Sequence, residues 1–374
     1  GLIAVVFLFF LDWRLSLAVL APVAFALIST LGTLKLIGRP LDIPGIMLWV
    51  VILGMGVDYA IYYTCTYQRH PEEASPAMNT VKLSIFLSAA TTFIGFGVLT
   101  LANHSLLRSI GLVSLLGIGY SLLGAYFILP TLMRKIFAPF EFPSGAVDAG
   151  SPEHFRRTIL RYRHLPGYPR VFARFKMKLD PMFSELDRYV QNPRRIMDIG
   201  CGFGVPAAWL LEIFPQAEVF GLEPDEERVL IANRAIGARG RVQVGRAPDL
   251  PDAEDPVDYV LMLDMLHLID DHELQLVFRR ICGKLGPDGT LVIRATVPSA
   301  GKVPWKRWIE TARLQWTGMP KRFRVERGIT GFMEAAGFDV AVHASPVPGV
   351  EEKWFIGKKR EEVSSPSWRI PEKK

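Results

Sequence analysis

The sequence predicts two structural classes on one chain: an α-helical transmembrane bundle of about five spans, then an α/β doubly wound domain. Charge is the first observation. Half of the 374 residues are hydrophobic, and residues 1–140 contain only eight Lys or Arg and five Asp or Glu. The second observation is the alternation of short apolar strands with helical segments after residue 194, which is typical of a doubly wound parallel sheet.

Composition disfavours several function classes. The net charge of +6 is modest for this length, so we expect no nucleic-acid partner. The three cysteines, Cys65, Cys201 and Cys282, include no C-x-x-C pair. Their odd number and spacing suit a reducing compartment and argue against a disulfide framework or a structural zinc site. We therefore predict no metal centre.

Four segments are long and apolar enough to cross a bilayer, which takes about 20 residues with few charges. They are Leu15–Leu34, Ile46–Tyr63, Leu83–Ala102 and Ser109–Met133. A fifth apolar run, Gly1–Leu11, is too short. We interpret it as the truncated first span of a longer membrane protein, with a signal-peptide core as the alternative.

Basic residues in the short loops set the predicted orientation, because Lys and Arg collect on the cytoplasmic side. One side of the predicted bundle holds Arg14, Arg69, Lys82, Arg134 and Lys135, and the other holds Lys35, Arg39 and Arg108. This bias predicts a multi-pass protein of the inner (cytoplasmic) membrane, with the residues after 140 in the cytoplasm.

Asp58 is the single charge within Ile46–Tyr63, and an ionisable side chain inside a span costs about 3 kcal/mol on insertion scales. It can be a proton or ion relay, or a buried structural residue bonded to a neighbouring helix. Gly54 lies one turn earlier on the same face and would let a second helix approach. The neighbour that we expect is a small, polar stripe of the next span, formed by Ser88, Thr91, Thr92 and Gly95.

The stretch GMGVDYAIYY, followed by SAATTFIGFGVLTLANHSLLRSIGLVSLLG and YFILPTLM, resembles the C-terminal membrane bundle of RND-superfamily transporters of the MMPL type. The resemblance covers about residues 1–137, and its GxxxDY pattern matches at Gly54, Asp58 and Tyr59. It implies that Asp58 and Tyr59 form a proton relay and that the exported molecules are lipids or lipid-like. The remaining half of such a transporter is an expected partner.

Residues 138–152 are rich in Pro, Gly, Ala and Ser and are expected to form a linker. The next segment, 153–193, is basic and aromatic, with eight Lys or Arg and two acids between Glu153 and Asp180. It can lie on anionic lipid at the membrane surface, form a helical lid on the next domain, or present a solvated helical face. Residues 361–374 are expected to be a disordered tail.

Residues 194–360 form the predicted doubly wound domain. Its strands are expected at 194–199, 217–223, 241–245, 257–263, 289–296, 338–345 and 352–359, and its helices at 205–214, 225–237 and 272–285. Ligands of such sheets bind at the carboxyl ends of the strands. The first strand runs into the sequence MDIGCGFG, which places a glycine-rich loop at that position.

The loop has the spacing G-x-G-x-G at Gly200, Gly202 and Gly204 and lacks the third glycine of a dinucleotide fingerprint. Glycines let a ligand approach the backbone closely. Asp198, just before the loop, can hold an ammonium group or a water. Glu223, at the end of the second strand, can bind both ribose hydroxyls. The pattern fits a nucleoside with a positive sulfonium better than a pyrophosphate, and NAD is the less favoured alternative.

The stretch from about residue 155 to 360 resembles the Rossmann-like class I S-adenosylmethionine-dependent methyltransferases. The resemblance implies S-adenosyl-L-methionine as the cofactor, with Asp198 and the three loop glycines in the first motif and Glu223 as the ribose acid. It also puts Ala247, in GRAPDLP, beside the adenine. Asp264 and His267, in LDMLHLI, match the segment near the transferred methyl group.

Methyl transfer asks little of the protein, because the sulfonium supplies the electrophile and the site orients an acceptor and excludes water. His267 is the candidate base if the acceptor is a hydroxyl or an acidic carbon; otherwise it lines the pocket. Asp264 is the second catalytic candidate, and contacts the cofactor or holds His267. Within the insertion at 298–323, the acceptor wall or part of the core is expected to include Trp305, Trp308 and Trp316.

The combined prediction is an enzyme: a membrane-tethered methyltransferase that modifies a lipid-like or aryl-acyl small molecule destined for the exporter. The soluble part is also similar to methyltransferases of aryl-polyene-type lipid pathways, through LDPMF, DIGCGFGVPAAWLL and LDMLHLI. One alternative is a transporter subunit whose cofactor-binding domain is regulatory. Another is a methyltransferase whose membrane part is only an anchor. The lipid bilayer is a partner in each case.

Overall fold

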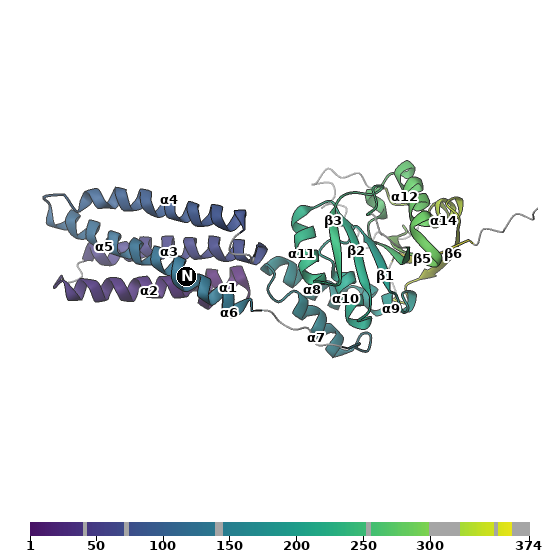
Figure 1. Cartoon of the computed structure of the whole chain (residues 1–374), viewed down its shortest axis with the longest axis horizontal. Helices are drawn as coiled ribbons and strands as arrows, with labels where there is room; N and C mark the ends of the chain where they lie inside the picture. The colour runs from purple at the N-terminus through teal and green to yellow at the C-terminus, as the bar shows by residue number, and fades with distance from the viewer. Residues whose placement is uncertain are drawn as a thin grey trace, which may run out of the picture. The chain divides into compact units, whose positions relative to one another are not determined.

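A computed structural model describes residues 1–39, 43–70, 75–138, 145–251, 256–298, 322–347 and 351–360. The chain forms two compact units, which are described one at a time (Figure 1). The helical unit comprises Gly1–Phe142 and Arg163–Val171, and the α/β unit comprises Pro143–Tyr162 and Phe172–Lys374. The three tryptophans of the predicted acceptor wall and the predicted tail lie outside the described residues.

Within the described residues, four helical segments of the first unit are long and apolar enough to span a membrane. They are α2 (Trp13–Leu36), α3 (Ile43–Arg69), α4 (Pro76–Leu99), and α5 (Ser105–Leu123) continued by the π-helical η1 (Gly124–Ile128) and α6 (Leu129–Ile136). A short helix, α1 (Leu2–Phe10), precedes them. Side chains of Asp12 and Ser75 cap the first turns of α2 and α4. The four predicted full spans are confirmed.

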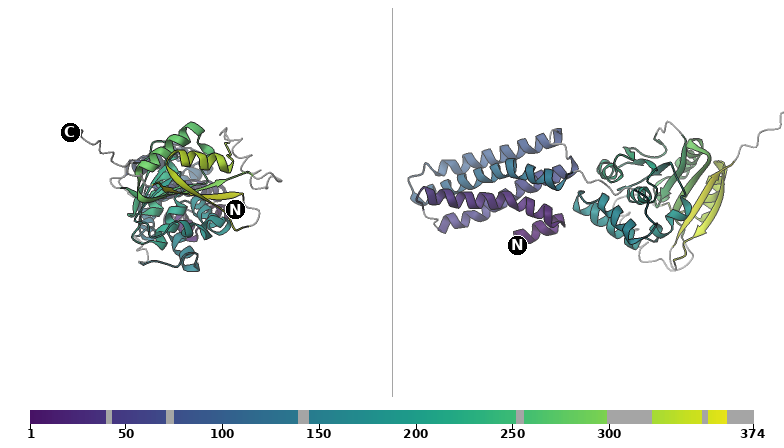
Figure 2. Two further views of the ribbon diagram at one scale, coloured as in Figure 1. Left: turned by 90° about the vertical axis from the view of Figure 1, so that its right-hand side faces the viewer. Right: turned by 60° about the horizontal axis from the view of Figure 1, so that its bottom comes forward.

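Helix α5 packs against α2, α3 and α4, and Figure 2 shows these helices side by side. Two glycines make the packing close. A side chain at Gly117 would collide with Ile52 of α3, and one at Gly124 would lie 2.9 Å from the Pro22 Cα atom of α2. Gly54 was expected to provide such a contact, but no described atom lies within 4 Å of its Cβ position. The expected close approach of α4 at Gly54 is therefore not found among the described residues. Gly56 is the glycine of α3 that meets a neighbour, because its Cβ position lies 3.0 Å from Oγ of Ser121 on α5.

The α/β unit contains a seven-stranded sheet in the order β3-β2-β1-β4-β5-β7-β6. The strands are β1 (Arg195–Ile199), β2 (Glu218–Glu223), β3 (Gly240–Val244), β4 (Val257–Leu263), β5 (Leu285–Thr296), β6 (Phe338–Ala344) and β7 (Glu352–Lys359). The first five are parallel, as predicted. The last two strands, whose direction the sequence does not predict, differ: β7 pairs antiparallel with β5, and β6 pairs antiparallel with β7.

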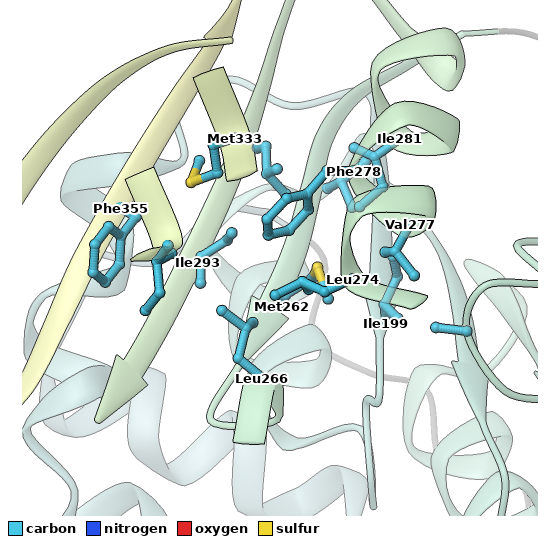
Figure 3. Packing of buried hydrophobic residues seen from close by; sticks show 14 of the residues in the cluster. Ile199, Met262, Leu266, Leu274, Val277, Phe278, Ile281, Ile293, Met333 and Phe355 are labelled. Atoms are coloured by element: carbon cyan, nitrogen blue, oxygen red, sulfur yellow. The ribbon is translucent and has the colours of Figure 1, made fainter. Parts of the chain in front are cut away.

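Helices cover both faces of this sheet. They include α7 (Pro152–Arg161), α10 (Val205–Ile213) and α11 (Glu226–Ile236) in one contacting group, and α12 (Asp271–Lys284) and α14 (Glu326–Ala335) in another. Figure 3 shows the side chains of Leu274, Val277, Phe278 and Ile281 pointing from α12 toward Met262 of β4 and Ile293 of β5. These residues belong to one buried cluster, which holds α12 against β4 and β5.

The basic segment before β1 forms α7, α8 (Gly167–Leu179), the 3₁₀ turn η2 (Pro181–Ser184) and α9 (Leu186–Tyr189). Two of its arginines are buried against the α/β unit. Nε of Arg157 lies 2.7 Å and Nε of Arg161 lies 2.5 Å from the carboxylate of Glu212 on α10. A carboxylate shared by two buried guanidinium groups fixes α7 on α10, because losing one partner would leave an uncompensated buried charge.

Candidate active site

The glycine-rich loop joins β1 to α10. Gly200, Gly202 and Gly204 all have positive φ, between 57° and 73°, a region that favours glycine. The space where a Gly202 side chain would stand contains no described atom within 4 Å. The Gly202 amide donates a hydrogen bond of 2.9 Å to Glu223. The loop therefore presents open backbone next to the acid at the end of β2, an arrangement with room for a ligand that carries hydroxyl groups.

Asp198 lies directly beneath the loop and is 1% exposed. Burial, followed by the charge of Glu223, raises the pKa of Asp198 from 3.8 to about 7. Its Oδ2 atom is buried and has no hydrogen-bond partner among the described residues. A buried acceptor without a donor is costly, so this carboxyl is suited to a donor or cation that a ligand brings.

A cavity of about 800 Å³ opens at the carboxyl ends of the strands, which is within the size range of small-molecule sites. Its lining includes Gly200, Glu223, Ala247 and Asp264. Apolar contributions from Leu222, Leu268 and Ile269 complete a surface suited to a planar base. The structure thus brings together four of the predicted cofactor residues, drawn from the loops after β1, β2, β3 and β4.

Asp264, directly after β4, belongs to a buried charge cluster that the sequence analysis missed. Its Oδ2 atom lies 2.7 Å from Nη1 of Arg294 on β5 and 3.7 Å from Nζ of Lys176 on α8. Arg294 is 4% exposed and also binds Asp180. Burial raises the pKa of Asp180, but Arg294 and Lys176 outweigh it and lower the pKa overall. The Oδ1 atom of Asp264 is buried and has no hydrogen-bond partner among the described residues, so it is suited to accept a hydrogen bond from a ligand in the cavity.

His267 does not line the large cavity. It lies in the 3₁₀ turn η3 (Leu266–Leu268), faces a smaller neighbouring cavity, and stacks on Phe323 with ring centroids 5.6 Å apart. Burial lowers the pKa of His267, although the nearby charge of Asp264 opposes the shift. The imidazole is therefore neutral at neutral pH. Its predicted role as a base stays a prediction.

Tyr162, at the end of α7, supports the loop from below. It is fully buried and its hydroxyl donates a 2.9 Å hydrogen bond to the carbonyl of Phe203 in the loop. Burial raises the pKa of this hydroxyl well above its usual value, so it remains a donor. Nothing in the local sequence signals this contact, because the two residues are 41 positions apart.

Two family profiles match the chain. Residues 196–289 match the family described as methyltransferase domain, and residues 5–151 match the MMPL family. The chain joins an MMPL-family region to a class I methyltransferase domain. The MMPL region places multi-pass membrane helices on the same chain as the methyltransferase domain.

Curated relatives match each part. The chain is 31% identical over 141 residues to trans-aconitate 2-methyltransferase of Pseudomonas paraeruginosa, covering 36% of this chain and 47% of that protein. It is 27% identical over 203 residues to fatty-acid O-methyltransferase of Mycolicibacterium smegmatis, and the match covers 48% of this chain and 73% of that protein. It is 29% identical over 119 residues to the hopanoid transporter HpnN of Burkholderia multivorans, and the match covers 32% of this chain and 13% of that protein. The chain thus spans less than half of the length of the trans-aconitate 2-methyltransferase and a small part of the transporter.

The class I assignment implies S-adenosyl-L-methionine as the cofactor of the methyltransferase domain, and the residues present fit it. Glu223 would accept the ribose hydroxyls, the open backbone at Gly202 would receive the nucleoside, and Ala247 would contact the adenine. The unpaired oxygen of Asp198 would accept from a donor of the methionine part. The bound cofactor supplies an electrophilic methyl group, and the domain's own groups orient it and exclude water.

We expect the affinity for S-adenosyl-L-methionine to rise as the pH increases through about 7, the pKa of Asp198 in the cofactor-free protein. A cationic ligand favours the ionised carboxylate, so binding releases a proton below this pH. The rise should be at most about tenfold per pH unit. Calorimetric titration of the full chain between pH 6 and 7.5 tests this, and Asp198→Asn should flatten the profile. A profile that keeps its slope in the variant would contradict the role of Asp198.

Tyr162→Phe removes one hydroxyl that holds the glycine loop and keeps the ring. We expect the dissociation constant of the cofactor to increase about fivefold, as for loss of one hydrogen bond, while kcat at saturating cofactor stays unchanged. Tyr259→Phe is the matched control, because the Tyr259 hydroxyl donates a hydrogen bond of 3.1 Å to the carbonyl of Gln191, which lies at the opposite end of β1 from the loop. Equal cofactor affinities in the two variants would show that Tyr162 does not position the loop.

Proposed function

We propose that this protein methylates an oxygen of a lipid-like or aryl-acyl acid at the cytoplasmic face of the inner membrane, using S-adenosyl-L-methionine. The methylated product would be cargo for a proton-coupled exporter of the RND/MMPL type, of which the helical unit is a part. The observation that carries the proposal is the presence on one chain of an MMPL region and a methyltransferase domain with a formed cofactor cavity.

The printed names of the relatives support an acidic, lipid-like acceptor. One relative is named for a fatty acid and another for trans-aconitate, and both names denote acids. The membrane relative is named for the transport of hopanoids. An acceptor with a long apolar part would reside in the bilayer that the helical unit spans, and its acidic end would reach the cytoplasmic surface.

The proposal is tested by incubating the full chain in membranes with S-adenosyl-L-methionine labelled on the methyl group. We expect label to enter the lipid extract, and Gly202→Arg to abolish the transfer, because the new side chain would fill the open space at the loop. Gly331→Arg is the matched control, since Gly331 is an exposed position of α14 with nothing within 4 Å. Cofactor binding without any transfer would instead favour a regulatory domain.

We also propose that Asp58 and Tyr59 form the proton relay of the exporter. On α3, Tyr59 is buried in the bundle and Asp58 is exposed on its outer surface. On α4, Ser88 and Thr91 are exposed as well, and the Thr91 hydroxyl bonds to its own helix at the Ser88 carbonyl. An acid on a lipid-facing surface is costly, so this polar face is suited to contact with a further membrane segment such as the remaining half of the transporter.

Asp58→Asn should abolish proton-driven export of the methylated lipid and leave methyl transfer unchanged, because the amide keeps the shape but cannot carry a proton. Export is measured as label in the outer leaflet or medium of cells that express the complete transporter. Tyr62→Phe, one turn away on the same helix and largely exposed, is the control that should export normally. Unchanged export in Asp58→Asn would remove the relay role.

A further inference from the structure

Arg322 occupies the junction of the two cavities in the α/β unit. The larger cavity is lined by four of the predicted cofactor residues, and the lining of the smaller one includes His267, Phe323 and Thr296. Among the described residues, Arg322 alone lines both. A cation at this junction faces the cofactor cavity from the side of the second cavity.

Contacts of Arg324 and Phe323 hold the backbone next to Arg322 in place. Arg324 donates to the carbonyl oxygens of Leu266 at 2.7 Å and Ile269 at 2.6 Å, and to the carboxylate of Asp271 at 2.8 Å. Phe323 stacks on His267. Residues 323 and 324 are therefore tied to the turn after β4, the segment expected near the transferred methyl group, and they hold the adjacent backbone of Arg322 beside this turn.

Within the part of the chain that the structure describes, the Arg322 guanidinium retains donors for a ligand. Its Nη1 atom lies 3.6 Å from Oδ2 of Asp270, which is an ion pair too long for a hydrogen bond, and its side chain is 43% exposed. Oδ1 of Asp270 already accepts the Glu273 amide at the start of α12. A planar guanidinium with unsaturated donors matches the geometry of a carboxylate.

Arg322 also lies at the correct end of the cavity for an acceptor. The predicted ribose acid, Glu223, ends β2, whereas the second cavity is lined by Ala295 and Thr296 from β5. The sheet order puts β1 and β4 between these strands. The two other cavity arginines, Arg228 and Arg246, lie near Glu223 and after β3, on the nucleoside side.

Each described carboxylate of the cavity has at least one partner, although the buried Oδ1 atom of Asp264 has none among the described residues. Glu223, Asp225 and Asp270 accept backbone amides, Asp264 pairs with Arg294, and Glu273 faces Arg246 at 3.9 Å. His267 is outside the lining of this cavity. Such a wall is suited to a nucleophile that arrives ionised, because a hydroxyl acceptor would need one of these groups to take its proton.

We propose that Arg322 binds the carboxylate of the methyl acceptor, so that the substrate class of this site is a carboxylic acid and the product is its methyl ester. This inference rests on the proposed methyltransferase function. A carboxylate oxygen forms a bond to the methyl carbon, and the carbon–sulfur bond breaks with its electron pair going to sulfur. The sulfonium becomes a neutral thioether, the carboxylate becomes a neutral ester, and no proton is released.

The test uses the full chain in bilayer discs with palmitic acid as the probe and methyl-labelled S-adenosyl-L-methionine. Methyl esters release labelled methanol in alkali, whereas ethers do not. We expect alkali-labile label, and Arg322→Gln should raise the KM for palmitic acid by about tenfold or more, as for loss of charge-assisted hydrogen bonds. The cofactor dissociation constant should not change. Arg322→Lys should restore part of the affinity, because it keeps the charge without the fork.

Arg327→Gln is the matched control, since Arg327 is exposed on α14 and lines neither cavity. The inference is overturned by an unchanged KM in Arg322→Gln, by loss of cofactor binding in that variant, or by label that is stable to alkali in a membrane lipid extract. Absence of transfer to both palmitic acid and the extract is a different result: it would remove the proposed function itself, and this inference with it.

Discussion

The glycine-rich loop of the α/β unit is held to the end of β2 by the Gly200 amide, which donates to the Leu222 carbonyl, and by the Gly202 amide, which donates to the Glu223 carboxylate. The second of these bonds is 2.9 Å long, and the loop glycines hold positive φ. Glu223 is thereby held near the buried Asp198, and its charge adds to the effect of burial in raising the pKa of Asp198. Two acids so close are unfavourable on their own, and a ligand with positive charge offsets the repulsion.

Much of the fold followed from local sequence. The expected bounds of β4 and β7 agree with the structure, because each is a short run of apolar or alternating residues bounded by polar turns. The directions of β6 and β7 could not be predicted from the local sequence. The antiparallel pairing of β6 and β7 depends on how the chain returns after α14, and residue periodicity is identical in parallel and antiparallel strands.

In the candidate site, too, local features could be predicted from the sequence and long-range contacts could not. Glycine spacing and the strand-end acid could be recognised because the residues are local and their types are dictated by backbone approach. The cluster around Asp264 could not, since Arg294 and Asp180 are 114 residues apart. A charged residue within the otherwise apolar VIRAT strand was its only signal. In the bundle, Gly54 had the right residue type for close packing, but which face of a helix meets its neighbour is decided by all the helices together.

Helix α7 lies outside the matched methyltransferase profile, which begins at residue 196, yet its arginines share Glu212 and its last turn leads into Tyr162 under the loop. The Val147 amide adds a bond to the Glu212 carbonyl. The structural unit of the methyltransferase domain therefore begins at α7, before the first residue of the matched profile. A fragment that began at residue 196 would keep the glycine-rich loop and Glu223, but it would lose the Tyr162 hydroxyl that binds the loop and the helix that covers Glu212.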